Sequence, residues 1–86
     1  MALEFWDIWF VNPETHEAVG FSGTEDKMTQ LYNNYLNGTF LPPDLEKTVI
    51  RLSKVVQNED GKIISDVILQ EADLTKQPWW NIYRDF

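Results

Sequence analysis

The side chains that could carry acid–base chemistry in this chain are one histidine, His16, and fourteen aspartates and glutamates. His16 lies between Glu14 and Glu17, in a segment whose Asn and Pro residues are typical of a turn. We therefore expect His16 to be a solvated surface residue rather than a catalyst. The absence of cysteine excludes disulfides, thiolate metal sites and cysteine nucleophiles.

Two further patterns resemble ligand sites only superficially. Asp66, Glu71 and Asp73 are close in sequence but lack the spacing of a calcium-binding loop, so we interpret them as solvated charges. The segment 22–24 precedes a predicted helix, as phosphate-binding loops do, but Glu25 and Asp26 would repel an anion there. With no nucleophile–base pair in the chain, we predict no catalytic residue, no metal site, no cofactor and no enzymatic activity.

The negative charge points to binding instead. A formal net charge of −7 argues against direct contact with nucleic acid or an anionic membrane, and it would attract a basic partner protein. About 30 Å of duplex DNA carries roughly 18 charges, so an acidic chain of this size could imitate only a patch of nucleic acid. The acidic residues that we expect to contact a partner come in pairs: Glu14 and Glu17, Glu25 and Asp26, and Glu59 and Asp60.

Aromatic residues are the second indication of binding. The chain has four tryptophans, three tyrosines and five phenylalanines, gathered mainly near its two ends. Aromatic side chains dominate protein interfaces because each buries a large area at little entropic cost. The adjacent rings of Trp79 and Trp80 cannot both enter one core from a regular element, so at least one is expected at an interface. We add Trp6, from the aromatic first strand, to the predicted contact residues.

The chain length of 86 residues predicts a single domain, 1–86. No stretch approaches the roughly 20 apolar residues that a membrane-spanning helix needs. The first residues lack the features of a signal peptide, and small secreted domains usually contain disulfides. We therefore expect a soluble, cytoplasmic protein that does not contact a membrane.

The first half of the chain predicts two strands and a helix. Residues 3–11 form a strand that is apolar on both faces, so it is either central or keeps one face for a partner. Residues 17–21 form the second strand of a hairpin, in which Ala18 and Gly20 leave space for a bulky neighbour. A helix starts at a capping box, Ser22 to Glu25, presents an apolar face at i, i+3, i+4 spacing, and ends at Asn37-Gly38.

The second half predicts another hairpin, with strands at 47–57 and 62–70. The turn between them fits a type I turn with a left-handed glycine bulge at Gly61, which would pair Asn58 with Lys62. It would also pair Val56 with Ile64, Lys54 with Asp66, and Leu52 with Ile68. The aromatic segment 77–86 is compatible with a short helix, which we favour, or with a last strand.

These elements predict an α+β fold in which a four-stranded, mainly antiparallel sheet of ββαββ order carries one helix on a face. The function that we expect is a small acidic protein-binding module, an inhibitor or accessory factor of a larger protein. Its composition is like that of phage-encoded antagonists of bacterial machinery, which is an analogy of composition and not of a motif. The alternatives are an obligate homodimer and a small-ligand-binding domain with a pocket beneath the helix, lined by Trp6, Trp9 and Tyr35.

Overall fold

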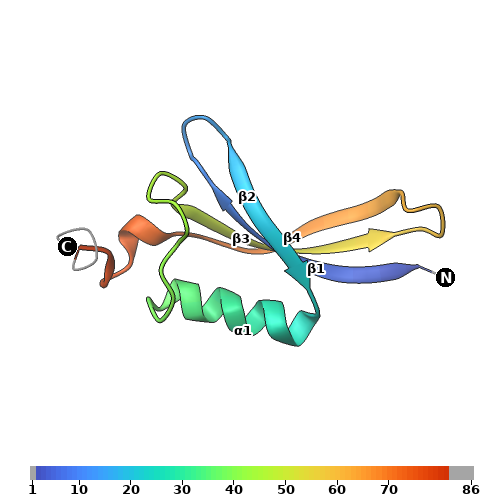
Figure 1. Cartoon of the computed structure of the whole chain (residues 1–86), viewed down its shortest axis with the longest axis horizontal. Helices are drawn as coiled ribbons and strands as arrows, with labels where there is room; N and C mark the ends of the chain where they lie inside the picture. Colours follow the sequence, from blue (N-terminus) through green and yellow to red (C-terminus); the bar gives the residue numbers. More distant parts are fainter. Residues whose placement is uncertain (1, 82–86) are drawn as a thin grey trace.

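A computed structural model describes residues 2–81 of the chain. Four strands, one α-helix and a short 3₁₀ helix follow one another along the sequence (Figure 1): β1 (Leu3–Val11), β2 (Ala18–Gly23), α1 (Glu25–Leu36), β3 (Val49–Gln57), β4 (Ile63–Asp73) and η1 (Leu74–Lys76). The strands form one antiparallel sheet of order β2-β1-β3-β4. The predicted α+β class, with a single helix on one face of a four-stranded sheet, is confirmed.

The core lies between the helix and one face of the two central strands. Ile8 and Phe10 of β1 and Ile50 and Leu52 of β3 are fully or almost fully buried there. Met28 and Tyr32 enter the same cluster from α1, and Leu31, Tyr35 and Leu36 pack against it, as the helical spacing predicts. The helix ends as expected, because Asn37 is its C-cap and Gly38 follows with a left-handed φ of +83°.

The helix start differs from the prediction. The N-cap is Thr24, whose side chain accepts a hydrogen bond from the Lys27 amide, and the predicted cap, Ser22, is the fifth residue of β2. Ser22 instead donates its hydroxyl proton to Asp7 Oδ1 at 2.6 Å. The capping box was therefore placed two residues too early, because Ser22 has a stronger acceptor on the neighbouring strand.

The second hairpin has the predicted turn but a different register. Gly61 has a φ of +80°, and the Asn58 amide donates to the Lys62 carbonyl at 2.9 Å, as expected. The register then shifts twice, so that Ile64 and Leu69 have no opposite residue on β3. Beyond the turn, the predicted pairs are wrong; the observed pairs are Val56 with Ser65, Lys54 with Val67, and Leu52 with Gln70.

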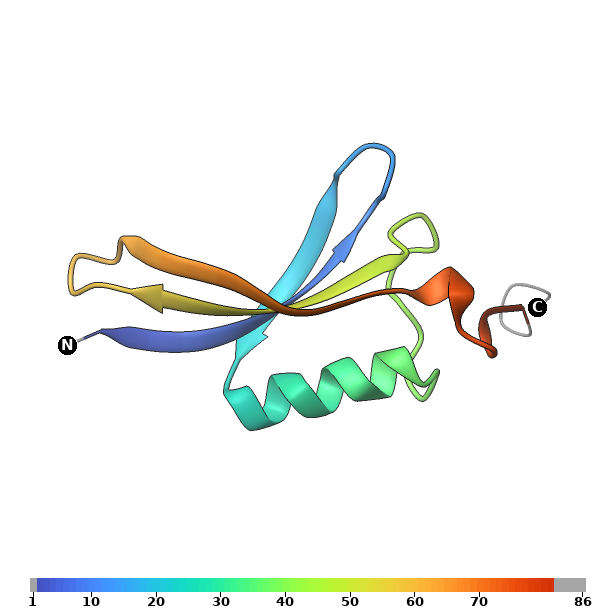
Figure 2. The same cartoon turned by 180° about the vertical axis from the view of Figure 1, so that it is seen from behind.

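The sheet is longer than the helix that covers it. Twelve helical residues extend for about 18 Å, whereas the eleven residues of β4 extend for about 36 Å. Residues 3–6 and 54–67 therefore project past the first turn of α1, and we call this projection the arm (Figures 1 and 2). The radius of gyration of 14.0 Å exceeds the roughly 12 Å of a compact chain of this length.

The strand and helix bounds otherwise differ from prediction mainly at their ends. Strand β3 begins at Val49 rather than at residue 47, because Lys47 pairs with Asp44 in the preceding connector at 2.7 Å. Strand β4 continues to Asp73, three residues past the predicted end. Half of the predicted aromatic segment 77–86, residues 82–86, lies outside the described residues; in the other half, residues 78 and 79 form a turn and residues 80 and 81 are helical. No helix in the described part of the chain is long and apolar enough to span a membrane.

Candidate protein-binding surface

The described residues leave many large apolar side chains in contact with solvent. Twelve of them are at least 38% exposed, whereas ten apolar residues form the buried core. A folded domain normally exposes single apolar residues, so their number matters less than whether they are contiguous. The twelve exposed residues are Leu3, Trp9, Val19, Phe21, Phe40, Leu41, Leu45, Ile63, Ile64, Val67, Ile68 and Leu69.

Five of the twelve lie on β4. Each is between 48% and 58% exposed, and we call this group the β4 strip: Ile63, Ile64, Val67, Ile68 and Leu69. Strand β4 is at the edge of the sheet and pairs only with β3 among the described residues. Most of the strip lies on the arm, past the start of the helix (Figure 1), and each of its residues is about half exposed.

The two register shifts explain why this strand is apolar on both sides. In a regular strand, successive side chains alternate between the faces of the sheet. Ile64 and Leu69 are the residues without an opposite partner, so the alternation restarts after each of them. Val67 lies opposite Lys54 on the helix side of the sheet, and Ile68 lies opposite Ser53 on the other side. The strip therefore presents aliphatic groups on both faces of the edge strand.

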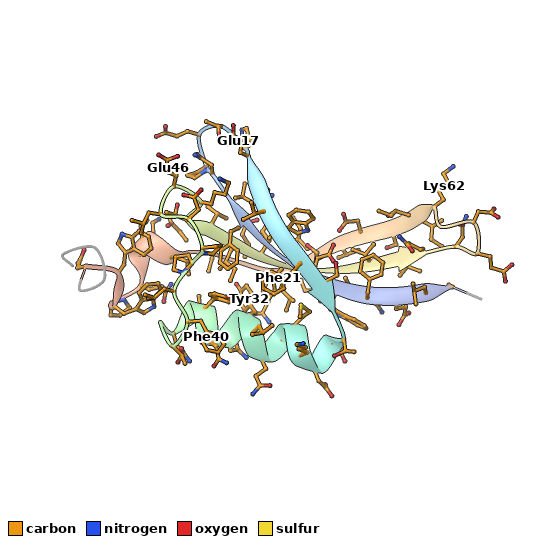
Figure 3. The ribbon with its side chains drawn as sticks, in the orientation of Figure 1. Glu17, Phe21, Tyr32, Phe40, Glu46 and Lys62 are labelled. Atoms are coloured by element: carbon orange, nitrogen blue, oxygen red, sulfur yellow. The ribbon has the colours of Figure 1, made fainter. Side chains whose placement is uncertain are left out.

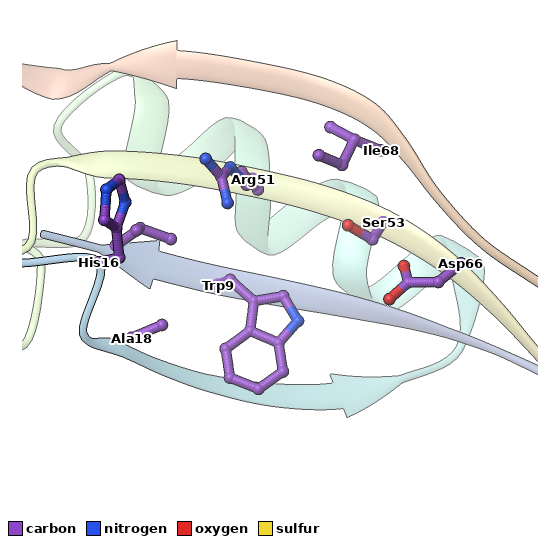
Figure 4. A pocket seen from close by; sticks show the side chains of 8 residues that line it. Trp9, His16, Ala18, Arg51, Ser53, Asp66 and Ile68 are labelled. Atoms are coloured by element: carbon purple, nitrogen blue, oxygen red, sulfur yellow. The ribbon is translucent and has the colours of Figure 1, made fainter. Parts of the chain in front are cut away.

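The face of the sheet opposite the helix contains a second feature, a shallow depression of about 410 Å³ (Figure 4). Trp9, Arg51, Ser53, Asp66 and Ile68 line it, together with Val11, His16 and Ala18. The Trp9 ring lies over Gly20, where a Cβ would come within 2.6 Å of the ring. The space that the sequence predicted beside Gly20 is thus filled by Trp9.

This open face also carries a buried carboxylate. Asp7 is 7% exposed and lies between Ser22 of β2 and Ser53 of β3 in the sheet register. Its hydrogen bond from the Ser22 hydroxyl compensates part of the cost of burying the carboxylate. The register thus brings one carboxylate and two hydroxyls side by side across three strands.

The ion pairs of the structure stabilise local geometry. Arg51 Nε donates to Glu71 Oε2 at 2.6 Å across β3 and β4. Lys54 Nζ lies 3.5 Å from Glu4 Oε1 and 5.5 Å from the centroid of the Trp6 ring, so the predicted pairing of Lys54 with Asp66 is replaced. In the connector, the hydrogen bond from Lys47 lowers the pKa of Asp44 and raises that of Lys47.

The three tryptophans predicted to contact a partner lie in different surroundings. Trp80 is buried in the core cluster, whereas Trp79 is half-buried and its Nε1 donates to the Leu36 carbonyl at 2.9 Å. Trp6 is half-buried on β1, and its Nε1 is buried without a hydrogen-bond partner among the described residues. Of these three rings, Trp6 is the one that belongs to the arm.

The predicted acidic residues do not gather on one side. Glu14 and Glu17 belong to the β1–β2 hairpin, Glu25 and Asp26 form the first turn of α1, and the pair at 59–60 lies in the turn at the end of the arm. These three places are separate corners of the molecule in Figure 1. Figure 3 shows Lys62 at the free end of the arm, at the opposite end of the view from Phe40, which follows the helix.

The other candidate sites of the sequence are not assembled in the described structure. His16 is exposed in the hairpin turn, with a φ of 65°. No group of three residues within 2–81 could hold a metal ion. The predicted pocket beneath the helix does not form as such, because Trp9 lies on the open face of the sheet whereas Tyr35 packs with Phe10 on the helix side.

Sequence reasoning missed the β4 strip. Ile64 and Ile68 were counted as members of apolar pairs with β3, which treated them as covered. The signal was nevertheless present, because Ile63, Ile64, Val67, Ile68 and Leu69 do not alternate with polar residues as a half-buried strand requires. A single predicted helix could cover only one face of such a strand, and only over about half of its length.

Comparison of the chain with protein-family models, with curated proteins and with solved structures finds no match.

Proposed function

We propose that this chain is a small acidic protein-binding module that docks a partner protein on its arm through the β4 strip. The observation that carries this proposal is the presence of five half-exposed aliphatic residues, on both faces of one edge strand. Exposed apolar patches of a few hundred Å² on a small protein commonly mark an interaction site. The rest of the sheet supplies the rigid support that such a site requires.

The partner that fits this surface has an apolar patch within a basic surround. The net charge of −7 attracts such a partner over about one Debye length and speeds its encounter, while burial of the strip supplies the affinity. Because the acidic pairs occupy separate corners, we assign them to steering rather than to a continuous imitation of nucleic acid. In this role the chain acts as an inhibitor or accessory factor that covers a surface of a larger protein.

Two variants test the proposal. One carries a photo-crosslinking residue in place of Ile64, on the strip, and the other carries it in place of Leu45. The two positions are 58% and 56% exposed, so they form a matched pair on different surfaces. In extract from cells of the source organism, we expect a specific adduct from position 64 that is absent from position 45. Unlabelled protein should compete for the adduct, and the Val67→Asp variant should compete poorly.

The charge argument adds a second readout to the same experiment. An adduct with a basic partner should weaken as ionic strength rises, because salt screens the attraction. The proposal is overturned if, at low salt, the probe at position 64 crosslinks to no protein except another copy of the chain. It is also overturned if the Val67→Asp variant competes for the adduct as well as the unchanged protein does.

A second candidate function, small-ligand binding, is favoured by the depression on the open face. Its volume of about 410 Å³ is within the range of ligand pockets, and Trp9 offers a ring face beside the Arg51 guanidinium. A ligand in this depression should change Trp9 fluorescence and raise the melting temperature of the protein, and the Trp9→Ala variant should lose both responses. A metabolite screen without any thermal shift would retire this candidate.

A further inference from the structure

We propose that the depression on the open face of the sheet receives an arginine side chain of the partner protein. This inference rests on the proposed function, because it names the basic group that the partner presents beside the β4 strip. Ile68 belongs to the strip and also lines the depression, so a partner that covers this face of the strip adjoins the depression. The volume of about 410 Å³ leaves room for a whole arginine side chain.

The lining of the depression includes a buried hydroxyl group without a hydrogen-bond partner. Ser53 is 3% exposed, and its hydroxyl makes no hydrogen bond to any other described residue. Asp7 lies opposite Ser53 in the register, but its carboxylate accepts from Ser22 instead. Because buried hydroxyls are normally hydrogen-bonded, Ser53 provides an acceptor for an N–H group that enters the depression.

The charges around the depression favour a cation at the end beside Asp66. Arg51 is the one lysine or arginine in the lining, and its charge is compensated because its Nε donates to Glu71 Oε2 at 2.6 Å. Asp66 is the one carboxylate in the lining, and it forms no ion pair within the described residues. Figure 4 shows its carboxylate directed toward the space beside the Trp9 ring, whereas Arg51 lies toward the opposite end.

The Trp9 ring favours a guanidinium group over an ammonium group. The residue is 38% exposed, and one side of its ring is close to Gly20, where a Cβ would come within 2.6 Å. The other face of the ring is left for a ligand. A planar guanidinium group stacks on such a face and donates from its edge to a carboxylate, whereas an ammonium group is a strongly hydrated point charge. The methylene groups of the arginine would pack beside Ile68.

The open shape of the depression favours a side chain of a protein over a free small molecule. Pockets for small molecules bury most of the ligand surface, and a shallow depression covers a ligand on one side only. An arginine that belongs to a partner needs no such enclosure, because the body of the partner covers its other side. Arginine and tryptophan are also the residues that most often dominate the binding energy of protein interfaces.

An NMR titration of the full chain with N-acetyl-arginine methylamide, at constant ionic strength, tests the inference. We expect saturable shifts of the Trp9 indole N–H signal and of the Ser53 and Asp66 amide signals. The matching citrulline compound has nearly the same shape without the charge, and its dissociation constant should be at least about fivefold higher.

Two variants separate the site from the general attraction of an acidic protein for cations. Asp66→Asn should raise the dissociation constant of the arginine compound at least about threefold. The matched control Asp60→Asn removes the same charge from the exposed turn at the end of the arm, and it should bind like the unchanged protein. Far-UV circular dichroism confirms that the variants are folded, and Ser53→Ala replaces Asp66→Asn if the latter unfolds.

The inference is overturned if the arginine compound gives no saturable shift, if the citrulline compound binds equally well, or if Asp66→Asn and Asp60→Asn bind alike. Asp66→Asn should also weaken the partner adduct at position 64. An adduct of unchanged strength overturns the inference and leaves the proposed function standing. Arginine binding that depends on Asp66, without any adduct at position 64, overturns the proposed function but not the guanidinium site.

Discussion

At the scale of single residues, Gly38 occupies a position that other residues do not fit. Its φ is +83°, and a Cβ there would lie 2.7 Å from Cγ of Trp79. Gly61 has a similar φ of +80° but nothing within 4 Å of the same position. The two glycines therefore separate the cost of backbone strain from the cost of a collision with the tryptophan.

We expect Gly38→Ala to lower the free energy of unfolding by about 3 kcal/mol, because it adds strain at positive φ to a displaced ring. The matched control Gly61→Ala carries the strain alone and should cost about 1 kcal/mol. Urea unfolding followed by tryptophan fluorescence measures both. Equal losses for the two variants would show that Trp79 does not pack on Gly38.

Tyr32 gives the protein a stability limit at alkaline pH. The side chain is 1% exposed, and burial raises its pKa above the usual 10.0, with a further contribution from the negative charge of Glu71. Above pH 10 the unfolded chain releases this proton more readily than the folded one, so the free energy of unfolding falls as pH rises. The Tyr32→Phe variant lacks the group and should show a shallower decline above pH 10. Identical slopes for the two proteins would contradict this assignment.

The tryptophan pair shows what residue-level reasoning from sequence cannot resolve. Two adjacent rings cannot share one core if they belong to a regular element, and the prediction assumed such an element. Pro78 and Trp79 instead lie in a turn, which allows Trp80 to enter the core while Trp79 spans the end of α1. The sequence predicts that one of these two indoles is exposed, but five of the large apolar side chains that are about half exposed are aliphatic residues of β4.

At the scale of elements, local signals predicted the fold well. The helical face, the stop at Asn37-Gly38 and the turn at 58–61 each depend on residues close in sequence, and each is confirmed. The register of β4 depends on how the whole strand packs, and two shifts separate Ile68 from its expected neighbour Leu52. The location of the binding surface follows from that register, so it could not be predicted from the turn alone.

The start of α1 offers a test of the observed cap. Thr24 satisfies the Lys27 amide, so Thr24→Ala should lower the free energy of unfolding by about 1 kcal/mol, while Thr24→Ser should retain most of the stability. Urea unfolding followed by the circular dichroism of the helix provides the measurement. If Ser22 were the cap, alanine at position 24 would have little effect, and the observed assignment would be wrong.

At the scale of the whole molecule, the mismatch between helix and sheet lengths determines the shape. The chain measures 48 × 28 × 17 Å, because about half of the sheet extends past the only α-helix among the described residues. A domain this small has a thin core, and it keeps a comparable number of large apolar side chains outside that core. One half of the sheet thus forms the core with the helix, and the other half, the arm, is left for contact with a partner.

This separation predicts uneven protection of the backbone amides. Near the helix, Ile50 and Leu52 pair with the buried Phe10 and Ile8 of β1 and lie beneath α1. Val56 and Val67 belong to the arm, past the start of the helix. At low protein concentration, amide hydrogen exchange at Val56 and Val67 should be at least about tenfold faster than at Ile50 and Leu52. Uniform exchange along β3 at low concentration would show that the arm is as stable as the helix-covered half, and the length of the helix would then not be what exposes the strip.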